Sequence, residues 1–306
     1  MAVYENTYGP YEAGLTPEWS RFLVLPRYAL RDVFGSKFFT AVFCLCFIYP
    51  LVAAILVYLH HNSNAIALMQ INVRELVPIN ASFFQYFVEV QCWVAFILTV
   101  LVGPALVSRD LANNGLPLYL CRPFSRAEYV LGKTAVLVIL LSLVTWAPGL
   151  LLFILQAYLE GARWFVSNLW MAGAIFVGCM TWIVMLSLLS LAVSAWVRWR
   201  VVAGGALLGL FFVPSAFGEM VNGLFMTRAG NLLSPAALMR NIWRGLFGNF
   251  TREIGRFNIE DAWGRSFVNV VLREPPLWAT WLVVALVCLA CLLLLARKVR
   301  AYEVVK

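Results

Sequence analysis

Uninterrupted apolar stretches of about 20 residues are the feature that most restricts how this chain can fold. A helix of that length crosses the hydrocarbon core of a bilayer, and closed barrels would instead show short alternating segments, which are absent. Six such stretches predict an all-α polytopic membrane protein with six transmembrane helices. They are Phe38–Leu59, Ser82–Val107, Thr134–Tyr158, Asn168–Val197, Val201–Val221 (interrupted in its second half by Pro214, Ser215 and Glu219) and Leu277–Ala296.

Composition agrees with a membrane protein and argues against a soluble domain. Hydrophobic residues make up 62% of the chain and charged residues 12%, whereas an ordinary soluble domain carries about 25% charge. The net charge is +8, and most basic residues of the predicted inner side border spans, where they would meet anionic lipid headgroups. The bilayer is therefore an expected partner, and nucleic acid is not.

The distribution of positive charge in short loops predicts the orientation. The first 18 residues lack the apolar core of a secretory signal, so residues 1–37 are expected to stay in the cytoplasm. Basic residues concentrate in this segment, in loop 108–133 and after the last span, while the two short loops on the other side carry only Arg74 and Arg163. The positive-inside rule then places both termini in the cytoplasm.

Residues 18–37 precede the first span and are too polar to cross a bilayer. Their apolar side chains recur at spacings of three and four, which predicts an N-terminal interfacial helix, kinked or restarted at Pro26. A soluble amphipathic helix is the alternative. The apolar positions are Trp19, Phe22, Leu23, Leu30, Val33 and Phe34.

The segment 222–276, between spans five and six, has the pattern of short outer helices. Ser234 followed by Pro235 is typical of a helix N-cap and first helical position, and Gly248 would end that helix. A second helix is predicted from near Asn258 to a stop before Pro275. Together they would form an extracytoplasmic cap or re-entrant hairpin, and a single membrane domain fills residues 1–306.

Residues Gly132, Lys133 and Thr134 match the end of a P-loop. The motif also needs a glycine five positions earlier and a preceding buried strand, but Ala127 occupies that position and no such strand precedes it. We therefore expect no nucleotide, cofactor or metal to be bound by this chain, and we find no set of residues that would form a catalytic site.

The whole loop gives a better explanation of these residues. Its second half, Arg122-Pro-Phe-Ser-Arg-Ala-Glu-Tyr-Val-Leu-Gly-Lys133, resembles the R-P-x-S-R-x-E-Y-x-x-G-K pattern in the cytoplasmic loop of ABC type-2 permeases, the membrane subunits of bacterial ABC exporters. The first half departs from that family: Arg109-Asp110 and Gly115-Leu-Pro-Leu stand where Glu-Arg and Gly-Thr-Leu-Glu are common. Six spans, inner termini and outer helices around Leu233-Ser234-Pro235 agree with the resemblance.

The resemblance implies that loop 108–133 receives the movement of a separate ATPase. An amphipathic helix from near Arg109 would enter a groove on that partner, Pro123 would end it, and Ser125 with Glu128 would form a capping box for the next helix. Lys133 would extend toward the membrane surface. The predicted ATPase-coupling residues are Arg109, Asp110, Leu111, Gly115, Leu116, Leu118, Tyr119, Arg122, Pro123, Arg126 and Glu128.

Four further residues are candidates for a pathway or an interface. Glu89, with Gln85 one turn before it, is an acid inside a span and is expected to face protein or water. It could line a translocation route, or it could make a structural contact between helices. Gly205 and Gly209 form a G-x-x-x-G that permits close helix contact, either at a dimer seam or within one subunit.

The function expected from the resemblance is that of a permease subunit in an ATP-binding cassette exporter of the cell (inner) membrane. The chain itself would not be an enzyme, because ATP and Mg would be bound by partner ABC ATPase subunits. It would act with a second copy of itself or a similar permease. The alternatives are a membrane subunit that transmits mechanical force to envelope partners without moving a solute, and a membrane-embedded enzyme.

Overall fold

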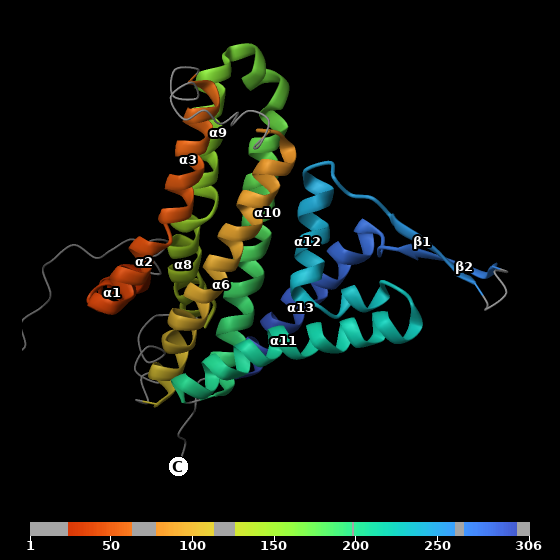
Figure 1. Ribbon diagram of the computed structural model, residues 1–306. Helices are drawn as coiled ribbons and strands as arrows, with labels where there is room; N and C mark the ends of the chain where they lie inside the picture. The colour runs from red at the N-terminus through yellow and green to blue at the C-terminus, as the bar shows by residue number, and fades with distance from the viewer. Residues whose placement is uncertain (1–23, 63–77, 113–125, 198, 261–265, 299–306) are drawn as a thin grey trace, which may run out of the picture.

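Among the residues that the structure describes, six helices are long and apolar enough to cross a membrane, so the protein is a multi-pass membrane protein. The computed structural model describes residues 24–62, 78–112, 126–197, 199–260 and 266–298. The predicted spans are confirmed, each within a few residues of its expected bounds. In order they contain α2 (Lys37–Leu45) with α3 (Ile48–His61), α6 (Ala81–Ala112), α8 (Arg126–Val144) with α9 (Trp146–Glu160), α10 (Ala162–Trp196), α11 (Arg200–Phe225) and α13 (Leu277–Lys298) (Figure 1).

The first and third spans are each broken into two helices. The first span breaks at Cys46 and Phe47, just before Pro50, and the third breaks at Thr145, just before Pro148. Proline has no backbone N–H to donate, and its ring collides with the carbonyl four residues earlier. The helical hydrogen-bond ladder is therefore interrupted at these two positions.

Helix α10 is the central element of the bundle. It packs against α6, α8, α9, α11, α12 (Pro235–Leu246) and α13. Two of its polar side chains bond to the backbone of α6: the Trp182 indole N–H donates to the Cys92 carbonyl at 2.7 Å, and the Ser194 hydroxyl donates to the Pro104 carbonyl at 2.8 Å. These buried bonds fix α6 against α10 at two levels.

Helix α11 leaves the bundle at a steep angle to α6 and α10 (Figure 1). It ends where Met226 adopts a left-handed conformation, with φ of 46°. The chain then turns back through a short 3-10 helix, η2 (Ala229–Leu232), which packs on α11. This return places the segment between spans five and six in the angle between α11 and the rest of the bundle.

Helix α12 confirms the first helix predicted in that segment. Ser234 is its N-cap and accepts a 3.2 Å hydrogen bond from the Ala237 N–H, and Pro235 is its first residue. Leu238 and Ile242 are buried against the core, and Gly248 follows the helix with φ of 73°. The local signals of capping and periodicity were therefore sufficient to define it.

The second predicted outer helix is wrong. Residues Glu253–Glu260 (β1) and Ser266–Arg273 (β2) pair as an antiparallel two-stranded sheet that extends away from the helices (Figure 1). The apolar residues of this segment are spaced in a way that fits a helix or a strand over so short a range. Its β-branched and aromatic residues favour the strand.

An N-terminal helix precedes the first span. Helix α1 spans Val24–Phe34, with Pro26 in its first turn, where the missing N–H costs no helical bond. Ala29, Leu30 and Val33 pack against the hydrophobic core, and α1 lies against α8. The part of the predicted 18–37 helix before residue 24 lies outside the described residues.

Candidate functional site

The predicted coupling loop enters and leaves the bundle through α6 and α8. Arg109, Asp110 and Leu111 form the last turn of α6, which runs without interruption to Ala112. The expectation that a separate amphipathic helix begins near Arg109 is therefore wrong, because the span simply continues as helix beyond its apolar part. Residues Gly115, Leu116, Leu118, Tyr119, Arg122 and Pro123 lie outside the described residues.

The second half of the loop signature forms the first turns of α8. That helix begins at Arg126, as the predicted capping box requires, while the cap residue itself lies outside the described part of the chain. Glu128 is in the first turn, where a negative charge favours the helix N-terminus. The pattern from Arg122 to Lys133 therefore begins outside the described residues and continues into α8.

Tyr129 and Lys133 point into the protein. Tyr129 is 1% exposed and Lys133 is 7% exposed, and the lysine ammonium lies 5.7 Å from the centre of the tyrosine ring, within range of a cation–π contact. The side chain of Lys133 is therefore buried in the protein, and its predicted extension toward the membrane surface stays a prediction. Helix α1, packed across α8, covers this side of the helix.

The Gly132-Lys133-Thr134 sequence is inside a helix. All three residues belong to α8, and the Thr134 hydroxyl donates to the Val130 carbonyl at 2.8 Å, one turn earlier. A P-loop instead presents unbonded N–H groups at the start of a helix to a phosphate. This geometry agrees with the interpretation that these residues are not a nucleotide site.

On α6, Glu89 and Gln85 contact the segment between spans five and six. The Arg240 side chain of α12 donates to the Glu89 carboxylate at 3.1 Å, forming an ion pair. Asn249, just after α12, donates to the Gln85 side-chain oxygen at 2.8 Å. Glu89 and Gln85 therefore connect the outer segment to α6, whichever further role they have.

A buried polar network, which the sequence did not reveal, joins α11, η2, α12 and the residues before α13. Glu274 is 5% exposed and accepts hydrogen bonds from the amide groups of Asn231 at 2.7 Å and Asn241 at 3.2 Å. Asn222 donates to the Asn231 side-chain oxygen at 2.8 Å. Since buried polar groups require partners, this network determines how the return segment folds back.

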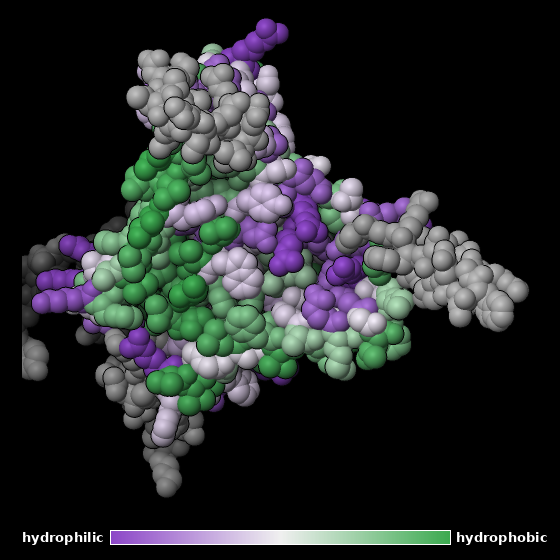
Figure 2. All heavy atoms as spheres, viewed as in Figure 1, coloured by the Kyte–Doolittle hydropathy of each residue, from purple (hydrophilic) through white to green (hydrophobic). Residues whose placement is uncertain are grey.

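Hydrophilic side chains gather over α12 and the adjacent part of the surface, while the face over α3 is hydrophobic (Figure 2). A cleft of about 240 Å³ opens in this region, and its charged lining is Glu219, Arg228, Arg240, Arg244 and Glu274. Acidic and basic groups are interspersed there. One signal in the sequence could have suggested such a region: the arginines of 222–276 recur on one side of the α12 helix.

No residue of the described part of the chain packs closely on Gly205 or Gly209. A Cβ atom placed on either residue would have no described neighbour within 4 Å. Gly204 is different, because a Cβ there would meet the Val100 carbonyl at 3.7 Å. Within the described residues, Gly205 and Gly209 therefore do not form the close helix contact that a G-x-x-x-G permits.

The described residues contain no group of three or more His, Cys, Asp or Glu side chains that could hold a metal ion. The polar residues of this region instead form an ion pair and hydrogen bonds that hold the helices against one another. No model of a known protein family matches the chain, and no curated protein matches it.

Proposed function

We propose that this multi-pass membrane protein is the permease subunit of an ATP-binding cassette exporter in the cell membrane, driven by ATPase subunits on other chains. The pattern from Arg122 to Lys133 supports this proposal. Its first residues come directly before α8, and its last residues form the first turns of that helix. A force applied to loop 108–133 would act directly on the third span.

The observation that carries the proposal is the packing of α1 on α8. The resemblance implies that a partner ATPase pushes both loop 108–133 and the segment before the first span. In the structure, α1 packs against α8, the helix that follows this loop, and Ala29, Leu30 and Val33 of α1 pack against the hydrophobic core. One partner could therefore move both together.

The helices offer a route for that movement across the membrane. Helix α8 packs on α10, and α10 also packs on α12, near Gly178 and Trp182, and on α13. Closure of the ATPases would tilt α8 with α1 and change the angle of α10 against α6. We propose that this opens an outward path near the polar cleft beside α12, and that the chain works with both termini in the cytoplasm.

A second copy, or a similar permease, completes the proposed transporter. Gly205 and Gly209 support this, because they leave a narrow, unoccupied strip on α11 against which another helix can approach closely. Substitution of Gly209 by leucine should weaken the dimer. Cross-linking between single cysteines placed on α11 would measure the fraction of dimer. Gly173→Leu on α10 is the control, because a Cβ on Gly173 also has no described neighbour within 4 Å.

The proposal is tested by ATPase activity that co-purifies with the tagged chain from its native membranes. Leu118→Asp and Arg122→Glu should abolish co-purification, because each changes the loop and neither lies in a span. Arg297→Glu, at the end of α13 on the same side, is the control and should retain it. A chain that purifies intact without any ATPase activity would exclude the permease function.

A second candidate function is favoured by the β1–β2 hairpin, which extends away from the helices (Figure 1). A projecting hairpin with an unpaired edge on each strand can add a strand from another protein. The chain would then transmit force to an envelope partner rather than move a solute. Cargo flux, measured with and without residues 253–273 while the ATPase stays bound, would separate the two. An exporter shows flux in the undeleted form, whereas a force transmitter shows none in either form.

A further inference from the structure

A large cavity lies beneath α1, at the end of the bundle where α6 ends and α8 begins. Its volume is about 930 Å³, which is within the range of pockets that hold small ligands. Five elements contribute to it: α1, the start of α2, the last turns of α6, α8 and the start of α11. Its lining includes Leu25, Tyr28, Arg31, Asp32, Ser36, Phe38, Phe39, Leu101, Val102, Leu106, Lys133 and Arg200.

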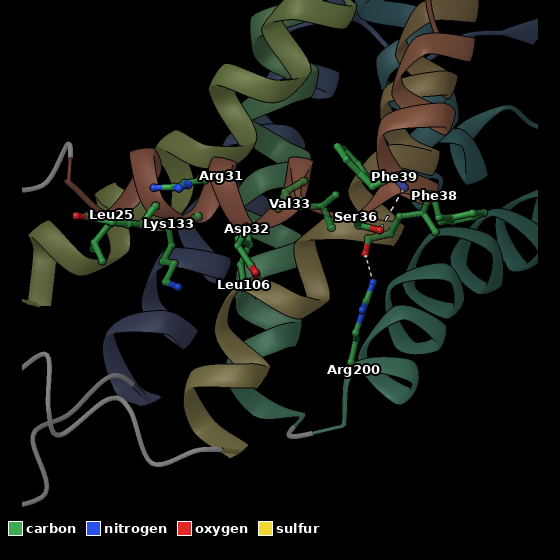
Figure 3. A pocket seen from close by; sticks show the side chains of 15 residues that line it. Leu25, Arg31, Asp32, Val33, Ser36, Phe38, Phe39, Leu106, Lys133 and Arg200 are labelled. Atoms are coloured by element: carbon green, nitrogen blue, oxygen red, sulfur yellow. Dashed lines mark hydrogen bonds between the residues drawn. The ribbon is translucent and has the colours of Figure 1, made fainter.

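The charged groups of the cavity are predominantly cationic. Arg31, Lys133 and Arg200 come from three different helices, and Asp32 is the one carboxylate among the lining residues. In the view of Figure 3, Lys133 and Arg200 lie on opposite sides of the cavity with Asp32 between them. The sequence separates these cations by up to 169 positions, so only the fold brings them together.

Lys133 and Arg200 are held in place by the protein. The Lys133 ammonium lies 5.7 Å from the Tyr129 ring centre and its side chain is buried, while the Arg200 guanidinium donates to the Leu101 carbonyl at 3.1 Å. A guanidinium with five N–H groups retains further donors after one such bond. The side chains are therefore positioned before any ligand arrives.

The remaining wall of the cavity is apolar and belongs to the membrane-spanning helices. Leu101, Val102 and Leu106 are on α6, and Phe38 and Phe39 begin the first span. Phe38 is 70% exposed, so this wall continues onto the outer surface of the bundle. A ligand that fills the cavity thus meets both charged side chains and an apolar wall.

From this combination we infer that the cavity binds the phosphate group of an anionic phospholipid. Basic pockets between spans at a membrane surface bind anionic headgroups. The phosphate would accept hydrogen bonds from Arg200, the rest of the headgroup would extend toward Lys133 and Arg31, and the acyl chains would lie along Phe38 and the α6 wall. A soluble phosphate ester would use the cations but leave the apolar wall empty. The inference requires only that the chain spans a membrane, so it stands whether or not the permease proposal does.

Occupancy of this site would join α1 to α8 and α11. The three cations lie on these three helices, and a headgroup that extends across the cavity between them links the N-terminal helix to spans three and five. We therefore expect anionic lipid to stabilise the full chain more than zwitterionic lipid does.

The test uses the purified full chain in nanodiscs of palmitoyl-oleoyl phosphatidylcholine, with and without palmitoyl-oleoyl phosphatidylglycerol. Thermal unfolding and native mass spectrometry report stability and retained lipid. The wild type should unfold at a higher temperature with phosphatidylglycerol and retain about one copy per chain. Free glycerol phosphate is the second arm, and an equal stabilisation by this soluble ester would overturn the assignment to a lipid.

Variants localise the effect. Arg31 and Arg200 are exposed side chains, so Arg31→Gln/Arg200→Gln should fold, and it should bind phosphatidylglycerol at least tenfold more weakly, since each lost bond to a charged group weakens binding by about that factor. Arg297→Gln removes a charge at the same membrane surface but outside the cavity, and should bind as the wild type does. Equal losses in both variants would show a general surface attraction and overturn the site.

Discussion

Gln91 of α6 donates a 3.0 Å hydrogen bond from its side-chain nitrogen to the backbone carbonyl of Cys46, in the break between α2 and α3. That carbonyl is the one that the N–H of residue 50 would bond in a continuous helix, and residue 50 is a proline. A neighbouring span therefore supplies the donor that the first span lacks. The contact explains why a fully buried glutamine occurs in an otherwise apolar helix.

Replacement of Gln91 by leucine should destabilise the protein by about 1–3 kcal/mol, because the Cys46 carbonyl would be buried without a donor. The Pro50→Ala background provides the matched comparison. Alanine restores an N–H at position 50, so the same substitution should there cost less than about 1 kcal/mol. Thermal unfolding in detergent of the wild type, the two single variants and the double variant completes this cycle. An equal loss of stability from Gln91→Leu in both backgrounds would contradict the explanation.

Arg240→Gln should lower the stability of the protein more than Glu89→Gln does. Arg240→Gln leaves the Glu89 carboxylate, whose side chain is 19% exposed, without its ion pair. Since the arginine is 44% exposed and partly screened, we expect a loss of only about 1–2 kcal/mol. Adding Glu89→Gln to this variant should recover part of the loss.

Arg244 is the control for that experiment. It is on the same helix, lines the same cleft, and its side chain has no partner within the part of the chain that the structure describes. Arg244→Gln should therefore unfold within a few tenths of a kcal/mol of the wild type. If it is destabilised as much as Arg240→Gln, the general charge of the cleft matters and the Glu89 pair does not.

Gly218→Ala should destabilise the return of the chain after α11. An added Cβ would strike the Gly230 carbonyl, a backbone atom of η2 that can move only if η2 moves off α11. Overpacking of this kind costs about 1–3 kcal/mol. Gly223→Ala, on the same helix, has nothing within 4 Å and should be neutral or stabilising, because alanine favours helix more than glycine does.

Glu274→Leu should be strongly destabilising, whereas Glu274→Gln should be tolerated. Leucine leaves the amide donors of Asn231 and Asn241 without an acceptor, a loss of about 2–4 kcal/mol for two buried groups. Glutamine retains one oxygen that can accept both bonds. Unfolding temperature and resistance of residues 222–276 to protease are the measurements, and similar behaviour of the two variants would show that the network is not the cause.

The six spans and the start of α12 were predictable because their signals are local. Apolar length defines a span, and a serine before a proline defines a cap. The hairpin was not predicted, since Ile259, Phe267 and Val270 fit a helical spacing as well as a strand over a short segment. Strand pairing depends on two segments meeting, and that information is not within either segment alone.

The polar contacts of the candidate site could not be predicted for the same reason. Glu89 was recognised as an acid that needs a partner, but Arg240 is 151 positions away in the chain. Likewise, the Gln91 side chain donates to the Cys46 carbonyl, which lacks its helical donor because Pro50, in a different span, has no N–H. The sequence shows that such polar residues need partners, but which partners they find depends on how the helices pack.

The breaks in the first and third spans lie at the same depth. From its break to its end, α3 has 14 residues and α9 has 15, and these ends meet where His61 and Glu160 approach to 3.1 Å. At about 1.5 Å per residue, both interruptions are about 21 Å from that shared end. The two interrupted helices run side by side, so their breaks lie in one plane. These two spans should bend most easily there, and the Gln91 hydrogen bond to Cys46 restrains the break in the first span.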